Sequence, residues 1–292
     1  MTGHATPARE RHELERSGSR LVYWLTGPSE GRLVTLTHGV SLDRHAFDEQ
    51  VPALVAAGYR VLTWDIRGHG RSQPMGMRVR LEIVADDLVA ILDDAGVQRA
   101  VFVGQSFGGM VVQEVLDRYP DRSLAMVVIG APALGDRPGP VMRVLQRLRV
   151  HMVKAWPYPL LRWVFARMVT EDPQVRTYVD RATRQLDKRG FIAVSAAAMD
   201  GYLRTGTAAR HEIPALLVHG DQEERSVLRA MRRWGERDRG VHRLEVEGGH
   251  LVNQENTAAF NQVLVAFLHE HVPVDPEVEG DRDRAGRERD PA

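Results

Sequence analysis

Short apolar runs alternate with amphipathic stretches along most of the chain, from Leu21 to about His271. A short apolar run between turn residues is typical of a buried strand, and apolar residues at three-to-four spacing are typical of a helix that packs on a sheet. Their alternation predicts an α/β fold with a mostly parallel central sheet flanked by helices. The predicted strands are 20–25, 33–37, 60–64, 100–103, 125–129, 215–218 and 242–246, and the predicted helices are 44–57, 81–95, 107–118, 226–237 and 256–271.

One long interruption breaks this alternation, between the strands at 125–129 and 215–218. It begins with a cluster of glycines and prolines at 135–140 and continues as several helical stretches separated by prolines and glycines. This pattern predicts a helical lid inserted between two strands of the sheet. The predicted organisation is an N-terminal extension (1–19), a first core segment (20–134), the lid (135–212), a second core segment (213–272) and a disordered charged tail (273–292).

Composition and charge narrow the class of protein. A chain of 292 residues with 43% hydrophobic residues can bury a sizeable core. Basic and acidic side chains balance at 39 each, so no positive field favours nucleic acid, and a small molecule is the expected partner. The absence of cysteine excludes disulfides and a thiol nucleophile. With a polar segment at 1–20 and no apolar run of membrane-spanning length, we expect a cytoplasmic protein that does not enter membranes; its oligomeric state is left open.

The most informative motif lies at residues 104–108, which read Gly-Gln-Ser-Phe-Gly directly after the apolar run 100–103. A helical apolar face follows at 107–118 and ends before Pro120. In a strand, turn and helix of this kind the serine sits on a sharp exposed turn, where only glycines leave room for the crossing backbone. The motif therefore predicts that Ser106 is a nucleophile.

A serine nucleophile needs a base, and a carboxylate to orient that base. His250 follows two glycines just after the last predicted strand, so a loop there can carry its imidazole back over Ser106. The carboxylate is less well defined by the sequence. Asp221, Glu223 and Glu224 all follow the strand that ends at 218–220, at the carboxyl edge of the sheet where sites gather in α/β proteins.

Residues 20–271 resemble the α/β-hydrolase family, and within it the lidded, cofactor-free esterases and lactonases. In that family the acid commonly stands three residues after the glycine that ends the strand, which is Gly220 here. The resemblance therefore implies Glu223 as the acid, although the usual residue is Asp. Asp221 remains the alternative acid.

The resemblance also implies an oxyanion hole. Residues 37–40, Thr-His-Gly-Val, are similar to the family's His-Gly turn, whose next residue donates one backbone N–H. That residue is Val40, and the residue after the nucleophile, Phe107, is the second donor. His38 is then a hydrogen-bonding scaffold of the turn.

A further match to the family lies at residues 65–72, Asp-Ile-Arg-Gly-His-Gly-Arg-Ser. We interpret it as a structural turn in which Asp65 and Arg67 hold loops by hydrogen bonds, and assign it no chemistry.

These residues predict a serine hydrolase that cleaves a carboxylic ester or lactone of a small to medium, mostly apolar substrate through an acyl-enzyme. No cofactor or metal is implied. Two alternatives use the same residues. One is an acyltransferase, cyclase or perhydrolase-type enzyme, in which water is not the acceptor, and the other is a ligand-binding, receptor-like protein with little turnover.

Overall fold

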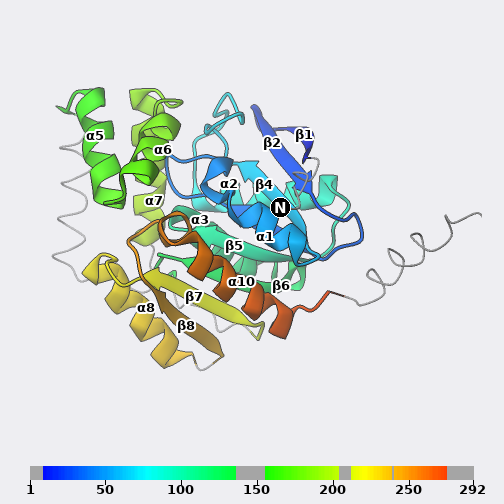
Figure 1. Cartoon of the computed structure of the whole chain (residues 1–292). Coiled ribbons are helices and arrows are strands. Elements are labelled where there is room, and N and C mark those ends of the chain that lie inside the picture. Colours follow the sequence, from blue (N-terminus) through cyan, green and yellow to red (C-terminus); the bar gives the residue numbers. More distant parts are fainter. Residues whose placement is uncertain (1–8, 136–154, 204–211, 239, 275–292) are drawn as a thin grey trace, which may run out of the picture.

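The computed structural model describes residues 9–135, 155–203, 212–238 and 240–274, and a twisted sheet runs through the centre of this part of the chain (Figure 1). The eight strands described have the order β1-β2-β4-β3-β5-β6-β7-β8. Every pairing from β4 to β8 is parallel, whereas β2 pairs antiparallel with both β1 and β4. The strands are β1 (Arg9–Arg16), β2 (Ser19–Thr26), β3 (Leu33–Thr37), β4 (Arg60–Asp65), β5 (Ala100–Gln105), β6 (Ser123–Ile129), β7 (Ala215–Gly220) and β8 (Val241–Val246).

All seven predicted strands are present as β2 to β8, with ends that agree within two residues. The predicted mostly parallel sheet is therefore confirmed. The first strand, β1, was not predicted, because Arg9–Arg16 is almost entirely polar and the sequence placed it in an N-terminal extension. It lies at the edge of the sheet, fully paired with β2 and largely exposed, so it needs little apolar surface.

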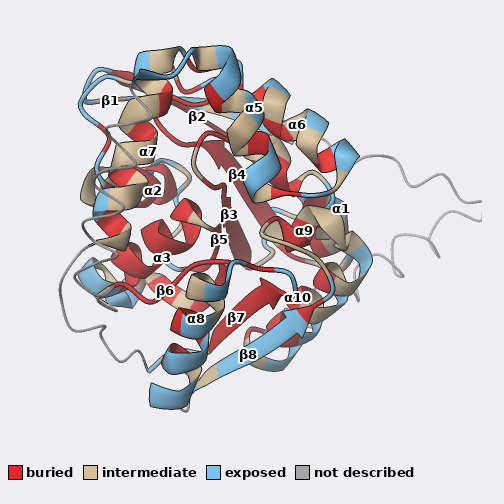
Figure 2. Cartoon of the chain, turned by 90° about the vertical axis from the view of Figure 1, so that its left-hand side faces the viewer, coloured by how far each residue is buried: buried red, intermediate tan, exposed pale blue. Residues whose placement is uncertain are grey.

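Helices cover both faces of the sheet. One core cluster joins the sheet to α2, α3 and α8, and a second joins it to α1 and α10. Figure 2 shows the strands β3, β4, β5 and β7 buried between these layers. The helices are α1 (Gln50–Ala56), α2 (Leu81–Asp94), α3 (Phe107–Arg118), α5 (Tyr158–Val169), α6 (Pro173–Thr183), α7 (Lys188–Tyr202), α8 (Arg225–Arg237), α9 (Val252–Glu255) and α10 (Thr257–His271), with short 3₁₀ helices η1 (Arg44–Phe47) and η2 (Pro120–Arg122).

The predicted insertion between β6 and β7 contains α5, α6 and α7. Apolar residues of α6 pack into the core cluster on the α1 side, whereas α7 packs against α2 and α3. Part of the glycine and proline cluster at 135–140, and all but the first residues of the predicted tail, lie outside the described residues. No helix among the described residues is long and apolar enough to cross a bilayer.

Asp65 and Arg67 of the turn at 65–72 hold neighbouring segments by hydrogen bonds, as the sequence predicted. The Asp65 carboxylate accepts hydrogen bonds from the backbone N–H groups of Arg44 (2.8 Å) and Arg71 (2.7 Å). The Arg67 guanidinium, fully buried, forms a two-pronged ion pair with the buried Asp87 of α2 at 2.5 and 2.6 Å. Two hydrogen bonds in a water-free setting fix the turn against α2.

Replacing Arg67 leaves the Asp87 carboxylate buried, and the partly exposed Arg16 is then its one ion-pair partner among the described residues. We expect Arg67→Met to lower the free energy of unfolding at neutral pH by about 3 to 5 kcal/mol, because an unpaired buried charge is costly. Urea denaturation measures this loss. Arg71→Met, an exposed arginine of the same turn, is the matched control. An equal loss in both variants would contradict the assignment, and Arg67→Met/Asp87→Leu is expected to be more stable than Arg67→Met alone.

Candidate active site

Ser106 occupies the sharp turn between β5 and α3. Its φ of 53° lies in the left-handed region, which is unusual for a residue other than glycine. Its backbone N–H donates to the carbonyl of Ile129 on β6 (2.7 Å), and its own carbonyl accepts from Met110 in the first turn of α3 (3.2 Å). The strained conformation is therefore held by bonds on both sides, as a nucleophile elbow requires.

The two glycines of the elbow are required by close backbone contacts. A Cβ atom at Gly104 would lie 2.2 Å from the carbonyl oxygen of Gly108, and one at Gly108 would lie 2.1 Å from that of Thr37 on β3. Neither distance is compatible with a side chain. The sequence motif predicted this, since only glycines leave room for the crossing backbone at such a turn.

The structure brings His250 and Glu223 together. The imidazole Nδ1 of His250 lies 2.9 and 3.0 Å from the two carboxylate oxygens of Glu223, and the Glu223 side chain is only 2% exposed. Burial, the largest single influence, would lower the pKa of His250, but the neighbouring carboxylates, Glu223 foremost, raise that pKa overall. Nδ1 is thus held as a donor, which leaves Nε2 to act as a base.

Asp221 lies elsewhere. Its side chain is exposed, and it accepts a hydrogen bond from the backbone N–H of Gly248 (2.9 Å). Glu224 caps the start of α8 through Ser226. Of the three carboxylates that the sequence left open, Glu223 is the one hydrogen-bonded to His250 in the structure.

Contacts from neighbouring elements gather these groups beside Ser106. The Gln105 side chain, one residue before the serine, donates to the carbonyl of His250 (3.1 Å). A Cβ atom at Gly130 would lie 2.8 Å from Glu223 Oε2 and 3.2 Å from His250 Nδ1, and the residue before Gly130 is the one that accepts from the Ser106 N–H. The ends of β5, β6 and β7 therefore converge on one point with the loop that follows β8.

The predicted oxyanion turn lies against the same serine. A Cβ atom at Gly39 would lie 3.3 Å from the Cβ of Ser106, so the main chain that continues into Val40 runs beside the elbow. His38 is buried and scaffolds this turn, since its Nε2 accepts from the Ile66 N–H (3.0 Å), as expected. Phe107 is buried at the first position of α3.

Two histidines near the turn are unsuited to acid–base chemistry. Burial lowers the pKa of His38 and lowers that of His69 to about 3. His69 is also used structurally, because its Nε2 accepts from the Ser41 N–H (3.1 Å). His250 is thus the histidine of this region whose imidazole is paired with a buried carboxylate.

A cavity of about 740 Å³ opens beside His250 and Glu223. Its other walls come from the α5–α6 junction, including Thr170, and from Glu255 of α9. The sequence did not predict Glu255 as a site residue. Its position five residues after His250 matches no motif that would indicate contact with the histidine loop.

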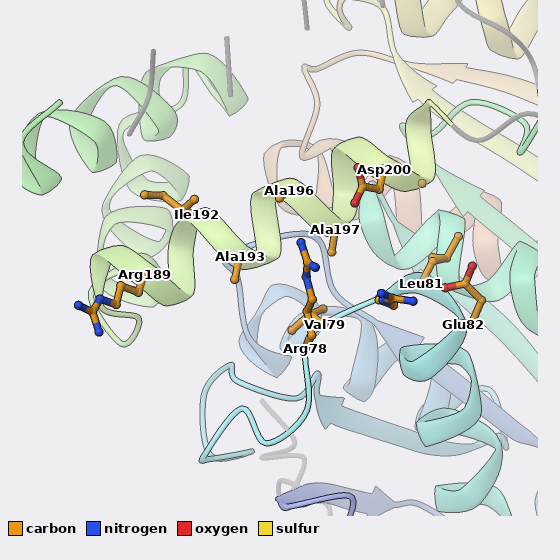
Figure 3. A pocket seen from close by; sticks show the side chains of 12 residues that line it. Arg78, Val79, Leu81, Glu82, Arg189, Ile192, Ala193, Ala196, Ala197 and Asp200 are labelled. Atoms are coloured by element: carbon orange, nitrogen blue, oxygen red, sulfur yellow. The ribbon is translucent and has the colours of Figure 1, made fainter. Parts of the chain in front are cut away.

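A second cavity, of about 580 Å³, lies between residues 78–82 and α7. Figure 3 shows Arg78 and Val79 facing Ala193 and Ala197 of α7. None of the predicted site residues lines this cavity, so it is separate from the His250 region.

A mostly parallel sheet with a Gly-x-Ser-x-Gly turn after β5 and a histidine loop after β8 is the arrangement of an α/β-hydrolase. Comparison with known proteins agrees with this fold class and also gives the family. Residues 28–237, well over half of the chain, match the model of the serine aminopeptidase S33 family, and the chain belongs to this family.

Solved structures with the same fold include a hydrolase from Pseudomonas aeruginosa PA01, at 26% identity and a TM-score of 0.78, covering 88% of this chain and 98% of that one. Another is the enol-lactonase from Burkholderia xenovorans LB400, at 24% identity and a TM-score of 0.77, covering 88% and 99%. Among curated proteins, the chain is 30% identical to epoxide hydrolase B of Mycobacterium tuberculosis over 182 residues, which are 59% of this chain and 51% of that protein. It is 34% identical to bifunctional epoxide hydrolase 2 of Sus scrofa over 127 residues, 43% and 22% respectively. The chain thus spans about half or less of these curated relatives.

The contact between Glu223 and His250 predicts a measurable charge effect. Glu223→Gln removes the charge that raises the pKa of His250, so we expect the imidazole to titrate at lower pH than in the wild type. NMR of the His250 ring protons measures this shift. Asp221→Asn is the matched control, because Asp221 contacts Gly248 and not the imidazole. A larger shift in Asp221→Asn than in Glu223→Gln would contradict the pairing.

Proposed function

We propose that this protein is a serine hydrolase that cleaves carboxylic esters or lactones of small to medium, mostly apolar compounds through an acyl-enzyme. The observation that carries the proposal is the hydrogen-bonded pair of His250 and Glu223 beside a serine in a strained elbow. An acyl transfer of this kind needs a nucleophile, a base and a group that orients the base, and these residues supply all three.

In the proposed mechanism Nε2 of His250 takes the Ser106 hydroxyl proton as the oxygen attacks the carbonyl carbon. The backbone N–H groups of Val40 and Phe107 stabilise the oxyanion of the tetrahedral intermediate. The imidazolium then gives its proton to the leaving alcohol, and Glu223 stabilises the positive charge in the meantime. Water, activated by the same histidine, hydrolyses the acyl-enzyme and restores Ser106.

Glu223 suits this role although the resembling family usually carries Asp. It lies three residues beyond Gly220, and its carboxylate faces Nδ1 with both oxygens. One oxygen also accepts from the Glu224 N–H (2.9 Å), which fixes the carboxylate. These contacts hold the longer Glu side chain against the imidazole.

The identity of the nucleophile separates ester cleavage from epoxide opening, the reaction named for two of the curated relatives. A carboxylate that opens an epoxide forms an ester, which water can cleave. A serine oxygen would instead form an ether, which this site has no means to hydrolyse. With Ser106 at the elbow, esters and lactones fit the chemistry and epoxides do not.

The insertion that contains α5, α6 and α7 is proposed to act as the lid over this site. Its α5–α6 junction forms a wall of the cavity beside His250. Tyr178 of α6 contacts Asp43, three residues beyond Val40, with its hydroxyl 3.0 Å from the carboxylate. The insertion thus borders the proposed site near both the base and the oxyanion turn, where a substrate would be enclosed.

Replacement of the nucleophile tests the proposal. Ser106→Ala removes the attacking oxygen, so we expect hydrolysis of p-nitrophenyl esters of increasing chain length to fall at least a thousandfold. Intact-mass spectrometry is expected to show an acyl adduct on the wild type and none on the variant. Ser29→Ala, at an exposed loop serine, is the control and is expected to keep full activity.

Undiminished ester turnover by a folded Ser106→Ala protein would refute the mechanism. Epoxides offered in parallel are expected to remain unreacted. Adding an alcohol or hydrogen peroxide as a competing nucleophile separates hydrolysis from acyl transfer, since only an acyltransferase or perhydrolase would divert most of the acyl group.

A further inference from the structure

Glu255, at the end of α9, joins the loop that carries His250 to the inserted helices. One carboxylate oxygen accepts from the backbone N–H of Gly249, the residue before His250. The other accepts from the hydroxyl of Thr170, which lies between α5 and α6, at 2.5 Å. The proposed mechanism makes no use of Glu255.

The Glu255 carboxylate lies close to two successive residues of the histidine loop, Gly248 and Gly249. A Cβ atom at Gly249 would lie 3.0 Å from Glu255 Oε2, and one at Gly248 would lie 3.2 Å from the same oxygen. The carboxylate therefore packs against bare backbone, which the two glycines leave open. Together with the Gln105 side chain on the carbonyl of His250, it holds the main chain on both sides of the imidazole.

The contact with the insertion has a defined direction. Thr170 is 3% exposed, and its hydroxyl oxygen accepts from the backbone N–H of Asp172 (3.1 Å). Its single hydroxyl proton is thus directed to Glu255. Both oxygens of Glu255 thus accept hydrogen bonds, one from the histidine loop and one from the insertion.

Charge supports the same role. The carboxylates that raise the pKa of His250 against the opposing effect of burial are Glu223, Glu255 and Glu224. Glu223 contacts the imidazole directly, whereas Glu255 acts from the other side of the loop. The remaining charged residues that line the cavity are Arg167, Glu171, Asp172 and Glu247.

We propose that Glu255 is a positioning residue for the catalytic histidine and that its bond to Thr170 makes the histidine loop depend on the α5–α6 junction. The proposal rests on the proposed function, because it assigns Glu255 a part in the reaction of Ser106. Glu255 touches neither substrate nor reacting atoms. It holds the backbone that aims His250, and its charge stabilises the imidazolium formed as Ser106 attacks.

Two substitutions separate position from charge. Thr170→Val removes the hydroxyl with little change of volume and leaves the charge of Glu255 in place. Glu255→Gln removes the charge but keeps an oxygen that can accept from Gly249. Thr170→Ser restores the hydroxyl and serves as the conservative rescue, and Glu30→Gln removes an exposed carboxylate outside this cavity as the charge-matched control.

We expect Thr170→Val to lower kcat for ester hydrolysis about tenfold with KM nearly unchanged. The orientation of the His250 imidazole matters for proton transfer in the transition state and not for substrate binding. Thr170→Ser is expected to recover most of this loss. Glu255→Gln is expected to lower kcat as well, and to move the acid limb of the pH profile to lower pH because His250 loses a charge that raises its pKa. Glu30→Gln is expected to change neither.

A second measurement does not depend on activity. In a Ser106→Ala background, NMR titration of the His250 ring is expected to give a lower pKa when Glu255→Gln is added and an unchanged pKa when Thr170→Val is added. Thermal unfolding of each variant identifies any that fails to fold, and the Thr170 variants then carry the test.

The outcomes separate the two proposals. If turnover does not depend on Ser106, the proposed function is wrong. If turnover depends on Ser106 but Thr170→Val and Glu255→Gln keep the wild-type kcat and the wild-type pKa of His250, the positioning role alone is wrong. A kcat loss in Thr170→Val that Thr170→Ser does not recover would also overturn it.

Discussion

The site depends on the close approach of three backbone segments at the carboxyl ends of β3 and β5. Gly104 and Gly108 approach other backbone there at distances that exclude side chains, and Gly39 lies against the side chains of Gln105 and Ser106. This contact sets the exposed turn of the serine, the start of α3 and the path of the oxyanion turn at once. A larger residue at Gly104 or Gly108 would displace the serine turn and the backbone packed against it. The geometry of Ser106 and that of its neighbours therefore depend on the same contacts.

The parallel sheet supplies the other partners by its order. Because β5, β6, β7 and β8 are adjacent and parallel, the segments that leave their carboxyl ends emerge side by side. The elbow, Gly130, Glu223 and the His250 loop belong to four successive strands and meet although the sequence separates the first from the last by nearly half the chain. The sheet thus provides the shared frame, and short side-chain bonds such as Gln105 to His250 complete it.

Much of this follows from the sequence, and the exceptions have physical reasons. Buried strands show as apolar runs, so β2 to β8 were predicted, whereas the exposed edge strand β1 has no such run. The elbow motif predicted a sharp turn at Ser106 from the steric needs of its glycines, and the structure has that turn. Spacing could not choose between Asp221 and Glu223, because both follow the same strand and only the path of the loop decides which one reaches His250. Glu255 gave no signal, since its partners come from a loop and from a distant insertion.

The inserted helices contact the surroundings of the site at two places. Tyr178 of α6 donates to Asp43 near the oxyanion turn, and burial raises its pKa well above the ordinary value, so it remains a neutral donor. Thr170 binds Glu255 and, through it, the histidine loop. These two hydrogen bonds attach the α5–α6 pair to the surroundings of the site at two separate points. Any repacking of α5 and α6, including that required to admit a different substrate, therefore acts directly on the backbone that holds the base and on the turn that leads to Val40.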